Sequence, residues 1–398
     1  MDIKIYPGKL TGTVTAIPSK SYAHRLLICA AFSDKPTFLH CPETNQDIEA
    51  TVNCLNAIGA TVLPVSDGYY VEPVHTIPLN AVLDCRESGS TLRFMLPIVC
   101  ALGIEATLHM AGRLPQRPLS PLWEELQRMG CTLTRNKDDT IQTAGRLRPG
   151  NYRIAGNVSS QFITGLLFAL SLLNGKSTIS VSGKLESKPY IDMTQDALRK
   201  FGVCTDGYIT KGSFPFHSPG NIDVEGDWSN AAFFLVATEH GSHITVENLN
   251  LQSQQGDRAV AEILKMQEAV PVISAANIPD LIPILAVHFA GKNGAKFTDI
   301  SRLRLKESDR VASVSRMLSA LGIPNESSED TLIVHAGTFA EGIVDSFGDH
   351  RIAMAAGIAA TLSGNPVILK GAECVAKSYP AFWQEFFRLG GKYEQYIR

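Results

Sequence analysis

The sequence repeats one pattern six times, and this repetition limits the possible folds more than any other feature. Each copy has a polar or capping opening, a mainly apolar stretch of helical length, a turn and a short strand. Repeats of this length indicate units that bury their apolar faces against one another. The six openings lie near Ser19, Ser88, Ser159, Asp227, Asp280 and Asp349.

One of the six modules is short. Successive openings are separated by 69, 71, 68, 53 and 69 residues, so the fourth module lacks part of the pattern. A second, more amphipathic helix is predicted in every module, and five of these helices carry a glycine where a helix-ending residue is favoured. The fourth has none and runs directly into "PVISAANIPDL". We expect two strands to be missing near residues 267–279.

Each complete module reads as strand, helix, strand, helix and strand, and its first helix is apolar on nearly all sides. A helix that is apolar all round is buried. The predicted fold is therefore α/β, built from α+β repeats. We expect a two-domain inside-out α/β barrel of six modules, with three buried helices per domain covered by sheet. The N-termini of these helices would converge and create a positive field.

Composition excludes several classes of protein. A chain of 398 residues is too long for one core and favours two domains. The net charge of −3 argues against a general nucleic-acid or membrane-surface binder. The apolar stretch "FITGLLFALSLL" is too short to span a bilayer and the first residues lack a signal-peptide core, so a cytoplasmic location is expected. Eight cysteines without a C-x-x-C pair suggest neither a zinc site nor a disulfide framework.

Basic residues recur at the openings of the apolar helices and in the linking turns. A single Lys or Arg in a turn is usually a solvated surface charge, but the recurrence in five modules predicts an anion site. These residues are Lys20, Arg25, Arg93, Arg117, Lys306, Arg310, Arg351 and Lys377.

Eleven short motifs resemble those of the enolpyruvyl transferases, and the resemblance covers the whole chain. They read "PSKSYAHR", "ESGSTLRF", "LPQRPLSPL", "SSQF", "SKPYIDMT", "EGDWSNAAFF", "QGD", "IPDL", "LKESDR", "GDHRIAMA" and "AKSYPAFW". The resemblance implies an N-terminal domain of residues 19–225 on the shikimate 3-phosphate side. Residues 1–18 and 226–398 would form the C-terminal domain, with crossings near Pro18 and Glu225.

The resemblance also implies a reaction of aromatic amino-acid biosynthesis in the shikimate pathway. The enolpyruvyl group of phosphoenolpyruvate would pass to the 5-hydroxyl of shikimate 3-phosphate, through a tetrahedral intermediate in an interdomain cleft, with release of phosphate. No metal or organic cofactor is expected, and neither is a nucleic-acid or membrane partner. The protein would be a monomer whose halves close on its substrates.

The resemblance assigns roles residue by residue. Asp280 is expected to be the base, Glu307 to carry the C3 proton of phosphoenolpyruvate, and Lys20 to stabilise developing charge. The shikimate 3-phosphate residues would be Lys20, Ser21, Arg25, Ser159, Ser160, Gln161, Ser187, Tyr190, Asp280 and Lys306. The phosphoenolpyruvate residues would be Lys20, Gly89, Arg117, Gln161, Arg310, Arg351 and Lys377.

Two departures and three alternatives accompany this interpretation. Arg302 stands where many relatives have an Asn that contacts shikimate 3-phosphate. If the strands missing from the fourth module normally support the helix after Asp280, Asp280 would be less firmly held. A transferase acting on UDP-N-acetylglucosamine would usually carry a cysteine before "RP" and an Asn after Lys20, whereas this chain has "GRLPQRP" and Ser21. The presence of Asp280, Glu307 and Lys306 argues against a catalytically silent anion-binding relative. RNA-end processing lacks a basic surface.

Overall fold

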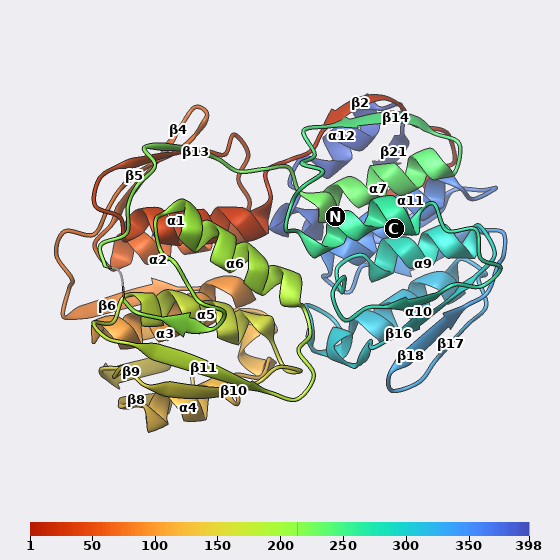
Figure 1. The fold of residues 1–398 in the computed structure, drawn as a ribbon. Helices are drawn as coiled ribbons and strands as arrows, with labels where there is room; N and C mark the ends of the chain where they lie inside the picture. Colours follow the sequence, from red (N-terminus) through yellow and green to blue (C-terminus); the bar gives the residue numbers. More distant parts are fainter. Residues whose placement is uncertain (213, 398) are drawn as a thin grey trace. The chain divides into compact units, whose positions relative to one another are not determined.

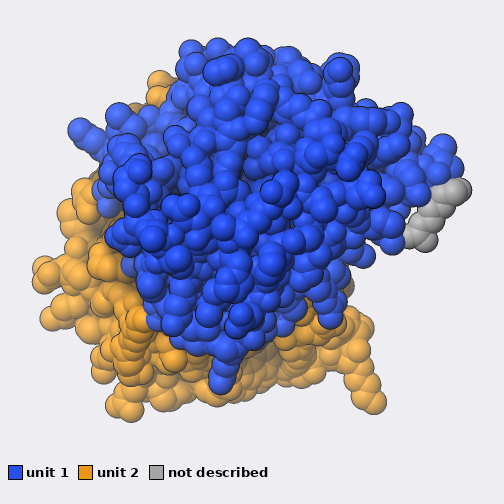
Figure 2. Space-filling view, turned by 90° about the vertical axis from the view of Figure 1, so that its right-hand side faces the viewer, with its two compact units in different colours: residues 1–17, 226–398 blue, residues 18–225 orange. Residues whose placement is uncertain are grey.

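The computed structural model describes residues 1–212 and 214–397, and it divides into two compact units (Figure 2). Unit 1 comprises Met1–Ile17 and Gly226–Arg398, and unit 2 comprises Pro18–Glu225. Each unit has its own hydrophobic core and its own sheets. The chain therefore crosses from one unit to the other twice. Which substrate each unit binds stays a prediction.

Unit 2 is drawn from red to green along the chain in Figure 1. Its helices are α1 (Lys20–Ala31), α2 (Gln46–Ala57), α3 (Gly89–Leu102), η1 (Leu114–Gln116), α4 (Leu122–Arg128), α5 (Ser160–Ser171) and α6 (Lys188–Lys200). Its strands are β3 (Thr37–His40), β4 (Thr61–Val65), β5 (Gly68–Glu72), β6 (Asn80–Asp84), β7 (Glu105–His109), β8 (Cys131–Arg135), β9 (Ile141–Gly145), β10 (Asn151–Ala155), β11 (Ser177–Ser182), β12 (Ile209–Thr210) and β13 (Asn221–Asp223).

Unit 1 takes its first two strands from the N-terminus and the rest from the second half of the chain. Its helices are α7 (Trp228–Glu239), η2 (Gly256–Ala259), α8 (Val260–Ile263), α9 (Ile282–Ala290), η3 (Ser301–Leu305), α10 (Arg310–Ala320), α11 (His350–Thr361), η4 (Ala372–Lys377) and α12 (Phe382–Arg388). Its strands are β1 (Ile3–Tyr6), β2 (Thr11–Thr15), β14 (His243–Glu247), β15 (Val272–Ser274), β16 (Ala295–Thr298), β17 (Asn325–Ser327), β18 (Thr331–Val334), β19 (Gly342–Asp345), β20 (Val367–Lys370) and β21 (Lys392–Gln395).

The second module shows the repeat in its complete form. The chain runs β6, α3, β7, α4, β8 and β9, and the sheet has the order β6-β7-β9-β8. The strands that flank α3 are parallel, and β9 is antiparallel to β7. A hairpin therefore follows the second helix, where the sequence pattern predicted a single strand. The difference arises because the hairpin strands are short and alternate polar with apolar residues, which is a weak signal beside the buried helix.

The fourth module is truncated, as the spacing predicts. Within the described residues its sheet has only β14 and β2, and its second helix is reduced to η2 and the four residues of α8. The chain then reaches β15 of the fifth module at Val272 without a hairpin. The other sheets have three or four strands.

The six apolar helices are buried, as their sequences predict. All nine residues of α9 are buried, and α11 is buried along its whole length. Five predicted openings are N-caps, and the side chains of Ser88, Ser159, Asp227 and Asp349 accept a hydrogen bond from a backbone N–H of the first turn. An inside-out barrel in each unit stays a prediction. Across the described chain, none of the helices combines the length and apolarity needed to cross a membrane.

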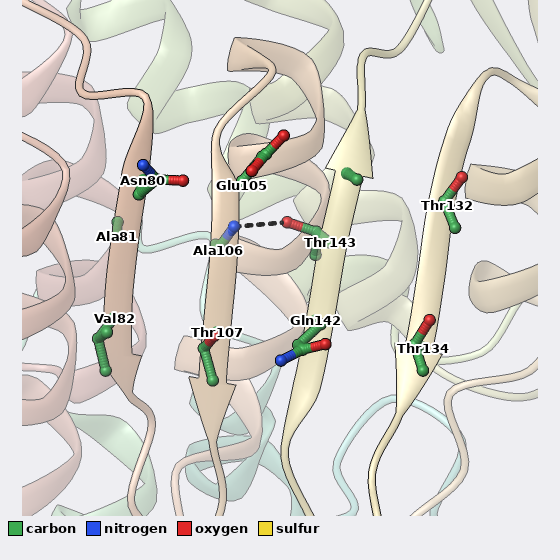
Figure 3. A pocket seen from close by; sticks show the side chains of 11 residues that line it. Asn80, Ala81, Val82, Glu105, Ala106, Thr107, Thr132, Thr134, Gln142 and Thr143 are labelled. Carbon is green, nitrogen blue, oxygen red and sulfur yellow. Dashed lines mark hydrogen bonds between the residues drawn. The ribbon is translucent and has the colours of Figure 1, made fainter.

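A polar pocket of 560 Å³ lies on the sheet of the second module (Figure 3). Here β7 pairs with β9 only at Thr107 and Leu108. Beyond that point the Oγ1 atom of Thr143 accepts a hydrogen bond from the N–H of Ala106 at 3.0 Å and donates one to the carbonyl of Ile104 at 3.0 Å. The side chain of Thr143 thus takes the place of a ladder bond between the two strands.

We expect Thr143→Val to lower the free energy of unfolding by about 1–3 kcal/mol, because the substitution leaves a buried N–H and C=O without partners. Urea unfolding followed by circular dichroism would measure the change. Thr132→Val is the matched control, since Thr132 lies on the neighbouring strand with an exposed side chain. Equal stability of the two variants would show that the Thr143 bonds contribute nothing.

Candidate active site

A buried guanidinium joins three acidic residues of unit 1. Arg310 is 1% exposed and begins α10. Its Nη1 atom donates to Asp280 at 2.8 Å and its Nη2 atom to Glu307 at 2.8 Å. Its Nε atom donates to Asp349 at 3.0 Å, and Nη2 makes a longer bond to Asp349 at 3.4 Å. Three segments that are far apart in the sequence therefore meet at one side chain.

Asp280 departs from the other five openings because it does not cap its helix. Leu281 occupies the N-cap position of α9, so the carboxylate of Asp280 is directed to side chains. Arg310 binds one oxygen, and Arg351 donates to the other at 3.0 Å. Burial raises the pKa of Asp280, but the charges of Arg351, Lys306 and Arg310 outweigh this effect and hold the pKa well below its usual value. The group is a carboxylate at neutral pH.

Arg351 and Lys306 place further positive charge beside Asp280. The Nη1 atom of Arg351 is buried and has no hydrogen-bond partner in the part of the chain that the structure describes. The ammonium of Lys306 lies 3.7 Å from Asp280. Burial lowers the pKa of Lys306 to about 8, against the opposing effect of Asp280. Buried donors of this kind favour an anionic ligand.

A fourth carboxylate, Asp257 in η2, was not among the predicted site residues. It is 2% exposed and accepts a hydrogen bond from the hydroxyl of Ser229, while its Oδ1 atom has no partner among residues 1–212 and 214–397. Burial and the charge of Asp280 raise its pKa to about 7. The "QGD" motif contains this residue, but the sequence gives no sign of its burial.

Arg25 is the central cation of the first module in unit 2, and its partners are neutral. The Nε atom donates to the hydroxyl of Thr194 at 2.9 Å, and the terminal nitrogens donate to the carbonyls of Ser21 and Tyr190 at 2.6 and 2.8 Å. Burial lowers the pKa of Arg25 to about 10. The guanidinium also lies over the ring of Phe94. A buried cation whose partners carry no charge favours an anionic ligand.

Lys20, the first residue of α1, forms an ion pair with Asp47 at 2.9 Å. Asp47 lies in the first turn of α2, where the helix dipole favours a carboxylate. Both side chains are largely buried, with 16% and 8% exposed. The sequence shows Asp47 only as a first-turn acid, so its contact with Lys20 was missed.

Gly89 lies where two guanidiniums approach the backbone of α3. A Cβ atom built at this position would lie 2.6 Å from Arg93 and 2.8 Å from Arg117, so a side chain would displace them. Arg93 donates to the Oε1 atom of Gln161 at 3.1 Å, and the amide of Gln161 donates to Ser90 at 3.0 Å. The N-terminal parts of α3 and α5 therefore bring Ser90, Arg93 and Gln161 together, and Arg117 approaches them from the end of η1.

The remaining predicted residues lie at or near the ends of several helices in both units. Ser159 caps α5, and Ser160 begins it. Ser187 precedes α6 with a left-handed backbone (φ 55°), a conformation that non-glycine residues rarely adopt. Lys377 is buried at the end of η4, which packs against α11. Arg302 lies in η3, near enough to lower the pKa of Lys306.

The described residues contain no group of three or more His, Cys, Asp or Glu side chains that could hold a metal ion. The groups described above can bind ions and transfer protons. Unit 1 provides carboxylates beside cations, and unit 2 provides cations with largely neutral partners together with one Lys–Asp pair.

Comparison with known proteins gives one consistent family. A family model described as EPSP synthase (3-phosphoshikimate 1-carboxyvinyltransferase) matches residues 5–270 and 267–386. The 3-phosphoshikimate 1-carboxyvinyltransferase of Clostridium kluyveri is 37% identical over 99% of this chain and 98% of its own length. That of Clostridioides difficile is 37% identical with the same coverage.

Solved structures share the fold. An EPSP synthase from Acinetobacter baumannii superposes with a TM-score of 0.80 at 24% identity, covering 99% of this chain and 100% of its own. The enolpyruvyl transferase NikO from Streptomyces tendae gives 0.76 at 17% identity, covering 99% and 98%. The mixed α/β class predicted from the sequence is thereby confirmed.

The raised pKa of Asp257 predicts a pH effect on stability. Between its ordinary pKa of 3.8 and about 7, the folded chain binds a proton that the unfolded chain releases, so this group stabilises the fold less as pH rises. Asp257→Asn should therefore gain stability relative to wild type as pH rises through this range. Thermal unfolding at a series of pH values would measure the difference, with the exposed Glu262→Gln as control. A constant difference would contradict the assignment.

Proposed function

Because the chain belongs to the EPSP synthase family, we propose that it transfers the enolpyruvyl group of phosphoenolpyruvate to the 5-hydroxyl of shikimate 3-phosphate, releasing phosphate. The observation that supports this most directly is the cluster of unit 1, where Asp280 and Glu307 are bound to the same buried guanidinium. Transfer requires a proton to leave the attacking hydroxyl and another to reach C3 of phosphoenolpyruvate, and two carboxylates can serve these two tasks.

Arg351 and Lys306 are proposed to bind the anionic groups of the substrates. The free Nη1 atom of Arg351 offers donors to a phosphate or carboxylate oxygen. Arg310 has five N–H donors, of which the bonds to Asp280, Glu307 and Asp349 use four. Arg310 is therefore proposed mainly to position the carboxylates, and one of its N–H groups remains for a substrate.

Asp280 is proposed to accept the proton of the attacking hydroxyl. Its depressed pKa makes it a weak base while Arg351 and Lys306 are directed at it. An anion bound to these two cations draws part of their charge away, so the pKa of Asp280 rises toward the range that a general base requires. Glu307 is then left to carry the C3 proton.

The unit 2 residues are proposed to hold substrate rather than move protons. Arg25 and the hydroxyls of Ser21, Ser159, Ser160 and Ser187, with Gln161 and Tyr190, suit the phosphate and ring oxygens of shikimate 3-phosphate. Lys20, Gly89, Arg117 and Gln161 of unit 2 suit the phosphate and carboxylate groups of phosphoenolpyruvate. Asp47 fixes the ammonium of Lys20, which stabilises charge as the tetrahedral intermediate forms. A cytoplasmic location stays a prediction.

Phosphate release with two alternative acceptors would test this function. In the presence of phosphoenolpyruvate and excess EDTA, shikimate 3-phosphate should support turnover, and UDP-N-acetylglucosamine should not. The physical reason is that the "GRLPQRP" loop lacks a cysteine and Ser21 follows Lys20. Turnover with UDP-N-acetylglucosamine alone, or no phosphate release with either acceptor, would refute the proposal. Loss of activity in EDTA would refute metal-free chemistry.

Variants should separate proton transfer from substrate binding. Asp280→Asn and Glu307→Gln should lower kcat by about 10²-fold or more, the usual scale for acid and base groups. Arg25→Ala should mainly raise KM for shikimate 3-phosphate, because its neutral partners leave the cation to the substrate. Steady-state kinetics would measure both constants, with Glu262→Gln as a surface control. A change in KM alone for Asp280→Asn would exclude it as the base.

A further inference from the structure

The truncation of the fourth module leaves β14 at the edge of its sheet. In each of the five other sheets, the strand that follows the buried helix has neighbours on both sides; these strands are β3, β7, β11, β16 and β20. In all five, the neighbour on the hairpin side is antiparallel. Within the described chain, β14 pairs with β2 alone. Compared with these five strands, β14 therefore lacks an antiparallel neighbour.

The outer edge of β14 carries backbone groups that can accept such a strand. The bonds from the N–H of His243 to Leu10 and from the N–H of Ala16 to Glu247 show that the odd-numbered residues of β14 face β2. The backbone N–H and C=O groups of Ile244 and Val246 consequently point to the outer edge of the sheet. Among residues 1–212 and 214–397 the only bond to these groups comes from the hydroxyl of Thr238, which reaches the carbonyl of Ile244 at 3.3 Å. That carbonyl retains a second lone pair.

The opposite edge of the two-stranded sheet is already covered. The N–H of Thr11 in β2 donates to the carbonyl of Leu389 at 2.8 Å, and the carbonyl of Thr13 accepts a bond from the guanidinium of Arg388 at 2.6 Å. The red β2 and green β14 lie side by side near the top of unit 1 in Figure 1. Among the residues that the structure describes, the β14 side is therefore the open edge of this sheet.

The sequence of β14 complements itself in the antiparallel direction. The strand reads "HITVE", with His243, Thr245 and Glu247 exposed and Ile244 and Val246 on the side of the core. If two copies pair about a twofold axis at Thr245, His243 of each lies opposite Glu247 of the other, and Ile244 lies opposite Val246. The edge strand β6, "NAVLD", does not match itself in this way, because its aligned ends are Asn80 and Asp84.

We propose that two copies of this chain associate through β14, so that β2 and β14 of both copies form one four-stranded sheet. Ile244 and Val246 of each copy would exchange four backbone hydrogen bonds. The geometry restores the strand number found in the complete modules. Because a strand edge buries little area, we expect a reversible dimer with a dissociation constant between micromolar and millimolar. This differs from the monomer that the family resemblance implies, and it does not depend on the proposed function.

Sedimentation analysis over a concentration series would test the dimer. Wild type should shift from monomer to dimer as the protein concentration rises. A monomer at millimolar concentration would overturn the proposal. This holds both for an edge that binds nothing and for an edge that binds another protein. Val246→Pro removes an outward N–H without touching the ladder to β2, so this variant should remain monomeric. Val82→Pro makes the same change on the edge strand β6, where the residue is exposed, and should dimerise like wild type. Dimerisation of Val246→Pro at the wild-type concentration would contradict the interface.

Charge exchange on the exposed face tests the register even if the proline variants fail to fold. His243→Glu places two carboxylates opposite each other, and Glu247→Lys places an ammonium opposite the imidazole. Each should weaken dimerisation by about tenfold, since every dimer contains two such pairs. The double variant His243→Glu/Glu247→Lys places opposite charges across from each other and should recover most of the loss. A double variant as weak as the single variants would exclude this register.

Discussion

The buried guanidinium of Arg310 is the interaction on which the geometry of unit 1 depends. It binds Asp280 before α9, Glu307 at the entry to α10 and Asp349 at the cap of α11. With Arg351 and Lys306 added, three cations face three carboxylates. Removing one partner from a buried ionic cluster typically costs about 3–5 kcal/mol, because the remaining charges lose their compensation. The same bonds that hold the helix ends together also fix the two candidate proton-transfer groups.

The buried arginines of the two units have different kinds of hydrogen-bond partner. In unit 1 the charges of Arg310 and Arg351 are met by carboxylates, whereas Arg25 in unit 2 is met by two carbonyls and a hydroxyl. Burial lowers the pKa of Arg25 for this reason, while the carboxylates raise that of Arg310 despite its burial. An anion therefore gains more from Arg25 than from Arg310. This contrast supports the proposal that the unit 2 residues only bind substrate, whereas unit 1 combines anion-binding cations with the proton-transfer carboxylates.

The sequence predicted the repeat, the buried helices and the short module, because each depends on local pattern and spacing. Five of the six openings are N-caps, but Asp280 is not, and only the tertiary structure shows that Arg310 and Arg351 take its oxygens. Asp349, Asp257 and Asp47 were missed as site residues for a similar reason. In sequence they look like a cap or a first-turn acid, and their partners lie 27 to 41 residues away along the chain.

The truncation of the fourth module was expected to leave Asp280 less firmly held, but the contacts that hold Asp280 come from other modules. The oxygens of Asp280 are bound by Arg310 and Arg351, which belong to α10 and α11 of the fifth and sixth modules. The fourth module still supplies Ser229 and Asp257, because α7 and η2 are retained although the hairpin is lost and the second helix is shortened. The hairpin contributes strands at the edge of a sheet, whereas the candidate proton-transfer groups are held at the N-terminal ends of helices. A deletion of this kind changes the edge that the sheet presents and leaves the carboxylate cluster intact.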